Sequence, residues 1–447
     1  MPTDSTMGER VTAARSLAES FLDDARTADP VTLRAVVRRL EELRGRPPAD
    51  EVELLFHTAA GVVGVRTRQP YASRHLDTAL RLFDPARFGR DELYLECALL
   101  CALSAIRPHE ARARFAHLVD RLDAPPARLA RLLTMIGLGD AWSGDVARGQ
   151  AALSRARALA IEAGRVDIQA EATSFLAKVE ALRGDTAAAS EHLSEARGLA
   201  ARAASSWVAA HLAECAAPLH LVNGDVQAWV GVLEFLVGTA VGANSGLFYE
   251  HRWELATHHA LHGDRAQALR LLAGIPDPPL EWPGAPALPA WRAWIAEPDD
   301  PETTARFERS LIGLNRPAER LSRARMAWLL GERHARLGRR ADAIRLLETA
   351  ASGYAAMGAG GPLARVSAAL DQVAAPVPAS PRQDLPLTPT ELRVAQSVAL
   401  GMSNRETAER LGVSAKTVEF HLANIFRKLA VRNRTELAAS LTRPGGA

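Results

Sequence analysis

The sequence predicts an all-α protein: an array of about nine helix pairs, then a proline-rich linker, then a small four-helix module. Two observations carry this prediction, a set of Gly-Asp pairs at a fixed spacing and a group of helix-start signals near the C-terminus. The chain has 447 residues, of which 48% are hydrophobic and 24% charged. This is the composition of a folded soluble protein and excludes wholesale disorder.

Several classes of protein are excluded at once. No apolar run approaches the roughly 18 residues that span a bilayer, and the N-terminal MPTDSTMGERVTAARS lacks the apolar core of a signal peptide. We therefore expect a cytoplasmic protein without a membrane partner. Cys97, Cys101 and Cys215 lack the spacing of a metal site or a disulfide framework, so we interpret them as small core residues and expect no cofactor.

The repeat is marked by turn residues. Gly-Asp pairs begin at Gly144, Gly184, Gly224 and Gly263, which are 40, 40 and 39 residues apart. The same spacing, extended in both directions, meets further turn residues at Pro30, Pro70, Pro108, Pro298 and Gly338. Nine turns at a period of ~39 residues indicate a repeat architecture.

Each Gly-Asp pair is followed by an Ala-rich amphipathic stretch, such as DTAAASEHLSEARGLA after Gly184. Apolar residues recur there at the helix period, and Gly suits the end of one helix while Asp caps the next. A unit of ~39 residues is thus interpreted as two antiparallel helices, and stacked units form an α-solenoid. We expect this array over residues 10–373, after a disordered segment 1–9.

These units resemble tetratricopeptide-like repeats, and more closely the helical-repeat sensor region of MalT-type regulators. The resemblance implies that the array senses or binds an effector, either a small molecule or a protein. MalT-type regulators also carry a P-loop ATPase, but no G-x-x-x-x-G-K-[ST] occurs in this sequence. ATP binding by that route is excluded.

The array is expected to end at a linker, residues 374–386 (AAPVPASPRQDLP), which holds four prolines and no apolar periodicity. Residues 387–447 then carry nine Lys/Arg against five Asp/Glu, a net charge of +4, whereas the whole chain has only +2. A basic module attached to a slightly acidic body places any polyanionic partner at the C-terminus.

Helix-start signals divide the C-terminal module into four helices. Thr388, Ser403 and Asn433 are each followed three residues later by Glu, the pattern of a capping box. Between them, Leu411-Gly412-Val413-Ser414 interrupts the helical pattern. A helix over 404–411, a tight turn and a second helix over 415–429 constitute a helix-turn-helix.

The second of these helices has two distinct faces. Val418, Leu422, Ile425 and Leu429 form one apolar stripe that we expect in the core. The opposite face carries Lys416, Phe420, Ala423, Asn424 and Arg427. Hydrogen-bond donors mixed with an aromatic ring and a methyl group suit contact with base edges and thymine methyls. The alternative is a solvated face that happens to include a phenylalanine.

The module resembles the LuxR-type DNA-binding domain of bacterial transcription regulators. The resemblance rests on Leu387-Thr388-Pro389 with Glu391, Gly401 with Ser403-Asn404, Ala408, Leu411, Ser414, Thr417-Val418, His421, Lys428-Leu429 and Arg434. It implies double-stranded DNA as partner, a homodimer through a fourth helix over 433–442, and contact with RNA polymerase. Glu419 stands where many members have a basic or neutral residue, and Ala430 where a glycine is usual.

The resemblance also implies which residues contact DNA. Bases would be read by Glu419, Phe420 and Ala423. Phosphate contacts or the docking register would depend on Thr388, Asn404, Arg405, Lys416, Thr417, Asn424, Arg427 and Lys428, and Ser414 and His421 complete the predicted DNA-binding set. Glu419 either accepts a hydrogen bond from cytosine or points sideways, towards Phe426.

One group in the array is a candidate effector site. His251, His258 and His262 fall on one helical face, with Trp253 and Glu254 nearby. The spacing is not the H-E-x-x-H of a zinc protease, so we predict no metal. The candidates are an effector-lining or pH-sensitive patch and ordinary packing.

The sequence therefore predicts a sequence-specific DNA-binding transcription regulator, controlled by an effector on the repeats. A second hypothesis is a repeat scaffold that attaches to DNA non-specifically. We expect no enzyme, because no nucleophile–base pair or paired acid cluster occurs at usable spacing.

Overall fold

The computed structural model describes residues 6–24, 30–67, 69, 71–104, 111–203, 206–238, 248–273, 287–314, 319–375 and 387–442. All regular structure in these ranges is helical, which confirms the all-α prediction. The chain divides into two compact units, Met1–Ala374 and Ala375–Ala447. No helix in the described ranges is both long and apolar enough to cross a bilayer.

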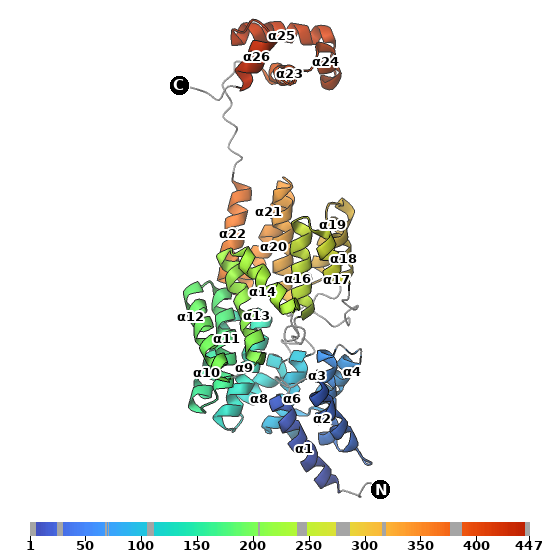
Figure 1. Cartoon of the computed structure of the whole chain (residues 1–447), viewed down its shortest axis with the longest axis vertical. Coiled ribbons are helices and arrows are strands. Elements are labelled where there is room, and N and C mark those ends of the chain that lie inside the picture. Colours follow the sequence, from blue (N-terminus) through green and yellow to red (C-terminus); the bar gives the residue numbers. More distant parts are fainter. Residues whose placement is uncertain are drawn as a thin grey trace. The chain divides into compact units, whose positions relative to one another are not determined.

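The first unit is a succession of helices, traced from blue to orange in Figure 1. Its elements are α1 (Met7–Asp24), α2 (Pro30–Glu42), α3 (Asp50–Arg66), α4 (Ala72–Leu82), α5 (Pro85–Phe88), α6 (Glu92–Ser104), the π-helix η1 (Ala111–Ala116), α8 (His117–Val119), α9 (Pro126–Trp142), α10 (Val146–Glu162), α11 (Val166–Arg183), α12 (Thr186–Ala203), α13 (Ser206–Asn223), α14 (Val226–Gly238), α16 (Phe248–Leu261), α17 (Arg265–Leu272), α18 (Leu288–Ala296), α19 (Pro301–Ile312), α20 (Arg320–Arg336), α21 (Arg340–Ala356) and α22 (Gly360–Ala374). From α9 to α14, each helix begins 20 residues after the one before.

The Gly-Asp turns have the predicted geometry. Gly144, Gly184, Gly224 and Gly263 all have positive φ, between 75° and 95°. Each following Asp accepts a hydrogen bond from the backbone N–H three residues later, at 3.0–3.3 Å. Gly338 also has positive φ, whereas Pro70 and Pro108 lie outside the described residues. At each of these four turns, one left-handed glycine and one capping carboxylate thus connect the two helices of an antiparallel pair.

The expected disorder over residues 1–9 is wrong for residues 7–9, because α1 begins at Met7. The Thr6 hydroxyl accepts a hydrogen bond from the Glu9 N–H, and the Glu9 carboxylate accepts one from the Thr6 N–H. This capping box is visible in the sequence as T-x-x-E.

The array folds back on itself, which the sequence analysis did not predict. Helix α22 packs against α11 and α13, more than 130 residues earlier in the chain. One apolar core joins residues of α9–α13 with residues of α20–α22, including Trp328, Tyr354 and Val366. The last helix of the unit therefore packs against helices from the middle of its sequence.

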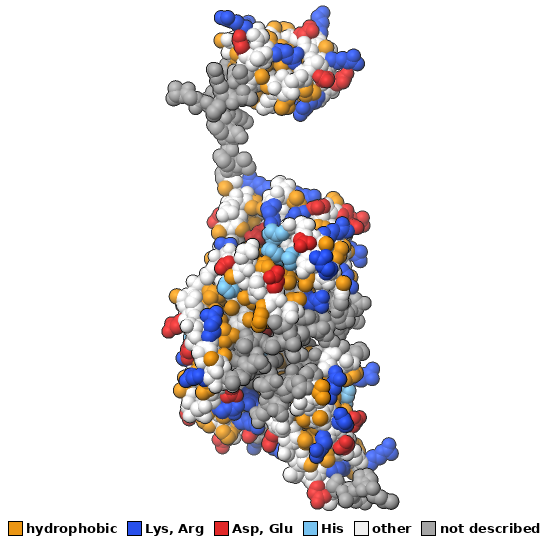
Figure 2. Space-filling view, viewed as in Figure 1, with side chains coloured by type: hydrophobic (Ala, Val, Ile, Leu, Met, Phe, Trp, Pro, Cys, Tyr) orange, Lys and Arg blue, Asp and Glu red, His pale blue; other side chains and the backbone are white. Residues whose placement is uncertain are grey.

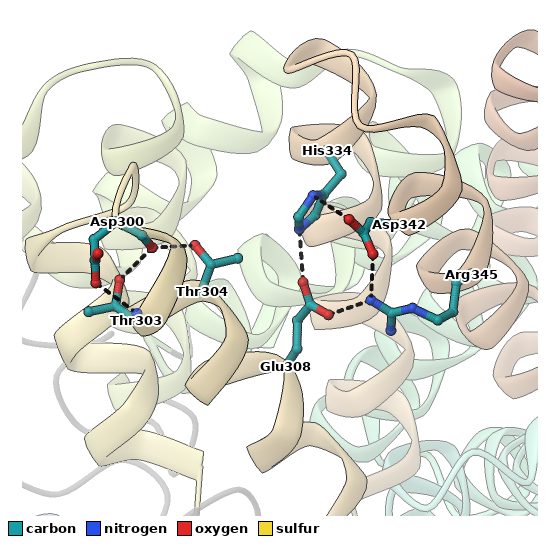
Figure 3. Close-up of polar contacts among 7 residues, drawn as sticks. All are labelled: Asp300, Thr303, Thr304, Glu308, His334, Asp342 and Arg345. Atoms are coloured by element: carbon teal, nitrogen blue, oxygen red, sulfur yellow. Dashed lines mark hydrogen bonds and ion pairs between the residues drawn. The ribbon is translucent and has the colours of Figure 1, made fainter.

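A polar network joins α19, α20 and α21 (Figure 3). The Glu308 carboxylate lies between His334 Nε2, at 2.9 Å, and the Arg345 guanidinium, at 2.5 Å, and Asp342 contacts the same Arg345. Burial opposes ionisation of Glu308, but the hydrogen bonds from His334 and Arg345 outweigh it and lower the pKa of Glu308. The network fixes the three helices that precede α22.

The three cysteines are buried and free, as expected of small core residues. Burial raises the pKa of the Cys101 thiol to about 12. A thiol with this pKa is not a nucleophile at neutral pH.

The second unit is a four-helix module of α23 (Pro389–Ala399), α24 (Asn404–Leu411), α25 (Ala415–Leu429) and α26 (Arg434–Thr442). Its small core is formed by Val394, Ala395, Val398, Ala408, Val418, Leu422, Ile425 and Leu437. The bounds of α24 and α25 coincide with the predicted ones. Residues 376–386 of the expected linker lie outside the described residues.

Candidate nucleic-acid interface

The turn between α24 and α25 is fixed by two local signals. Gly412 ends α24 in the left-handed region, with φ of 67°. The Ser414 hydroxyl then caps α25 by accepting a hydrogen bond from the Thr417 N–H at 3.1 Å. These residues set the angle between the two helices of a helix-turn-helix.

Helix α25 has the two faces that the sequence predicts. Val418, Leu422 and Ile425 are buried, and Leu429 packs at the edge of the same core. On the opposite side Lys416, Glu419, Phe420, Ala423 and Arg427 are exposed. Phe420 leaves 67% of its surface exposed, which is unusual for a ring of this size in a folded domain. Glu419 is exposed to solvent.

Other residues of the predicted set have structural contacts. Thr388 forms a capping box with Glu391, and the Ser414 hydroxyl lies 2.7 Å from that of Thr417. Asn404 accepts a hydrogen bond from Arg434, which also donates to the Met402 carbonyl oxygen.

Three further members of the predicted set contact neighbouring side chains. Arg405 pairs with Glu409, and Asn424 accepts a hydrogen bond from Arg427 at 3.1 Å. His421 is half-buried and has an edge-on contact with Phe420.

Lys428 forms an ion pair that sequence reasoning missed. Its ammonium donates to Glu391 Oε2 at 2.6 Å, and the same oxygen accepts from the Thr388 N–H at 2.7 Å. The Lys428 ammonium, with the help of that backbone N–H, lowers the pKa of Glu391 to about 2. The pair fastens the end of α25 to the start of α23.

This pair predicts a pH dependence of stability. Because the pKa of Glu391 is depressed, its contribution is fully present above the ordinary value near 4.5 and is lost as the pH falls towards 2. We expect Glu391→Gln to lower the stability of the C-terminal unit at pH 6 and to have little effect near pH 2. Urea unfolding at several pH values measures this. Glu409→Gln, in the exposed pair with Arg405, is the matched control and should have little effect at either pH.

The start of α26 differs from the predicted capping box in one hydrogen bond. Asn433 caps α26 by accepting from the Glu436 N–H, but the Glu436 carboxylate accepts in return from Arg432 N–H. Ala430 ends α25 with φ of 52°, a left-handed conformation that glycine adopts without strain.

The candidate effector residues, on α16 and in the turn that follows it, lie in three different surroundings. Trp253 is stacked on Trp291 at 4.7 Å, in an apolar core that also contains Trp229, whose ring has an edge-on contact with His258. The ring centroids of His258 and His262 lie 4.1 Å apart, and burial lowers the pKa of His258 to about 4.

His251 and Glu254 instead face a buried polar cluster with Lys178, Glu214 and Arg325. One signal for this cluster was present in the sequence: Lys178 is the only lysine among residues 1–386. No metal-binding group of three or more ligands occurs among the described residues.

The geometry shows that the C-terminal unit is a helix-turn-helix domain, and that one face of its second helix is exposed. Residues 385–441 match the family model of bacterial regulatory proteins of the luxR family. The C-terminal unit is thus a LuxR-family domain, as its sequence predicted.

Curated relatives match over the same region. The transcriptional regulatory protein UhpA of Escherichia coli (strain K12) is 53% identical over 60 residues, 13% of this chain and 30% of UhpA. The transcriptional regulatory protein ComA of Bacillus subtilis (strain 168) is 41% identical over 61 residues, 14% of this chain and 28% of ComA. The chain thus spans less than a third of the length of these relatives.

The helical repeats resemble a solved structure in fold. A Rap protein, whose crystal structure is complexed with competence and sporulation factor, aligns with a TM-score of 0.56 at 11% identity. The alignment covers 81% of this chain and 99% of the Rap chain. At this identity the likeness shows the helical-repeat fold alone.

Proposed function

We propose that the protein is a sequence-specific DNA-binding transcription regulator that inserts α25 into the major groove. The observation that carries the proposal is the exposed face of α25, where Phe420 and Ala423 stand among Lys416 and Arg427. Apolar groups suit thymine methyls, and the cations suit the flanking phosphates. The N-termini of α24 and α25 add backbone N–H groups directed at phosphate.

The regulator is proposed to act as a homodimer through α26, on two half-sites about one helical turn apart. It is proposed to act in the cytoplasm, to contact RNA polymerase, and to be controlled by an effector on the helical repeats. The Rap protein of similar fold, complexed with competence and sporulation factor, supports a binding role for such repeats.

Selection from a random DNA pool tests the proposal, with the full chain and with residues 382–447 in parallel. Enrichment of one inverted repeat by both proteins is the expected result if the repeats leave the site free. Enrichment by the fragment alone would mean that the repeats hold the domain off DNA until an effector binds. If neither enriches a site, the scaffold with non-specific DNA attachment replaces this proposal.

Lys416 is assigned to a phosphate rather than to a base. It is exposed in the first turn of α25, next to the capping residue Ser414. We expect Lys416→Ala to weaken binding to all DNA sequences about equally and to reduce the slope of log affinity against log salt by about 1. Titrations at several salt concentrations, on a specific and a scrambled duplex, measure both effects. A loss confined to one base position would contradict the assignment.

A further inference from the structure

The interior of the helical-repeat unit contains a cluster of polar side chains, all buried except the partly exposed Glu254, that DNA binding does not use. Its members come from four helices and are Lys178 on α11, His211 and Glu214 on α13, His251 and Glu254 on α16, and Arg325 on α20. Burial of so many ionisable groups is costly in the absence of good partners. Lys178 with Glu214 and Arg325 with Glu254 are two ion pairs of this cluster, and their geometries differ.

The first pair is well formed. Lys178 Nζ donates to Glu214 Oε1 at 3.3 Å, and His211 Nδ1 lies 3.7 Å from the other carboxylate oxygen. Both members of this pair expose less than a tenth of their side chains. Their charges compensate one another within the core.

The second pair is loose. Arg325 Nε lies 3.6 Å from Glu254 Oε1, which is longer than a hydrogen bond. In the part of the chain that the structure describes, neither this buried Nε nor the buried Nδ1 of His251 has a hydrogen-bond partner. A guanidinium nitrogen and an imidazole nitrogen therefore lie in the same cluster as the Glu254 carboxyl group with hydrogen-bonding capacity unused.

Aromatic rings enclose the guanidinium of this second pair. The Arg325 guanidinium carbon lies 5.1 Å from the ring centroid of Trp229 and 5.1 Å from that of Trp328. Both tryptophans are buried, so the guanidinium is held by cation–π contacts in a position that side-chain motion cannot easily change.

One face of α16 leads from this pair to the surface. His251 is buried, Glu254 exposes 22% of its side chain, His258 is half-buried and His262 is exposed. These residues follow one another at helical spacing, and histidine side chains gather on the visible face of the unit in Figure 2. Glu254 is therefore the member of the pair that keeps some solvent exposure beside these imidazoles.

The protonation states fit a ligand of mixed charge. Burial raises the pKa of Glu254, and the nearby Arg325 acts in the opposite direction. Burial also lowers the pKa of His251 to about 4, so that its ring is neutral at pH 7 and one ring nitrogen accepts a hydrogen bond. The Glu254 carboxyl group and the fixed Arg325 guanidinium stand side by side, with Nε and Oε1 3.6 Å apart.

We propose that Glu254 and Arg325 form a binding site for a small zwitterion, a free α-amino acid. Glu254 and His251 accept hydrogen bonds from the ligand ammonium, and Arg325 donates to the ligand carboxylate. The regulatory part of this inference rests on the proposed function, in which such a ligand would be the effector of the helical repeats. Binding itself is independent of DNA.

The test is thermal unfolding and calorimetric titration of the full chain with each of the common L-amino acids. Simple alkylamines and simple carboxylates at the same concentration are the chemical controls. We expect at least one amino acid to raise Tm and to bind saturably, whereas molecules that carry only one of the two charges do neither. Absence of any amino-acid effect, or an equal effect of amines alone, would overturn the proposal.

Variants locate the site. Glu254→Gln is expected to weaken amino-acid binding about tenfold or more, because a charge-assisted bond is lost. The matched control is Glu96→Gln, a buried carboxylate paired with Arg128 and Arg131 in a different core, which should lower Tm without changing the ligand response. Should Glu254→Gln fail to fold, Arg325→Lys keeps the charge but removes the forked donors, and it should weaken binding as well. An undiminished affinity in the folded variants rules out this site.

Failure of this inference is distinguishable from failure of the proposed function. If the chain enriches a DNA site but binds no amino acid, only the proposed zwitterion site is refuted. If the chain binds an amino acid but enriches no DNA site, only the proposed sequence-specific DNA binding is refuted.

Discussion

Replacement of Phe420 by alanine is expected to reduce the preference of this protein for its operator over random DNA. The ring exposes 67% of its surface at the centre of the outward face of α25, so its loss creates no cavity in the core. A base-edge contact of this kind contributes about 1–3 kcal/mol to discrimination, or roughly 5- to 150-fold in affinity ratio. Lys416 and Arg427 remain, so binding to non-specific DNA should hardly change.

Competition titrations with operator and scrambled duplexes measure that ratio for wild type and variant. Leu400→Ala is the matched control, because Leu400 is also a large apolar residue, 74% exposed in the same unit, but lies at the end of α23. The control should keep the full preference. An equal loss of affinity for both duplexes in Phe420→Ala would show that the ring contributes to docking rather than to base reading.

The C-terminal unit was predictable because its signals are local. The capping residues Thr388, Ser403 and Ser414 fix helix starts, and Gly412 fixes the turn, so each helix is determined by residues within a few positions of its ends. The stripe of Val418, Leu422 and Ile425 then specifies which face is buried. The Glu391–Lys428 pair was missed because its partners are 37 residues apart and no periodicity joins them.

The helical repeats were predictable only as a repeat. The Gly-Asp turns determine where helices end, but they contain no information about how far the array curves. The packing of α22 on α11 depends on contacts between residues far apart in sequence, and so does the ion pair of Glu254 with Arg325. For the same reason the histidine stripe of α16 was recognised while its partners on α13 and α20 were not.

The packing of α22 against α11 depends on glycines that let the two backbones come into contact. A substitution at one of these glycines is therefore expected to have a large effect on stability. A Cβ atom on Gly361 would lie 2.4 Å from the carbonyl oxygen of Ala181 and 3.0 Å from a methyl carbon of Val222. Since the nearer atom belongs to the backbone of α11, rotation of a side chain cannot relieve the overlap. We expect Gly361→Ala to destabilise the helical-repeat unit by about 1–3 kcal/mol, because α22 must shift away from α11.

The same substitution at Gly198 is the matched control, because that glycine is an exposed residue of α12 with open space around its Cβ position. There alanine should stabilise the helix by up to about 1 kcal/mol. Thermal unfolding of the full chain should therefore show Tm changes of opposite sign for two identical substitutions. If Gly361→Ala leaves Tm unchanged or raises it, α22 is not held tightly against α11. The fold-back of the array would then be a weak contact rather than part of its core.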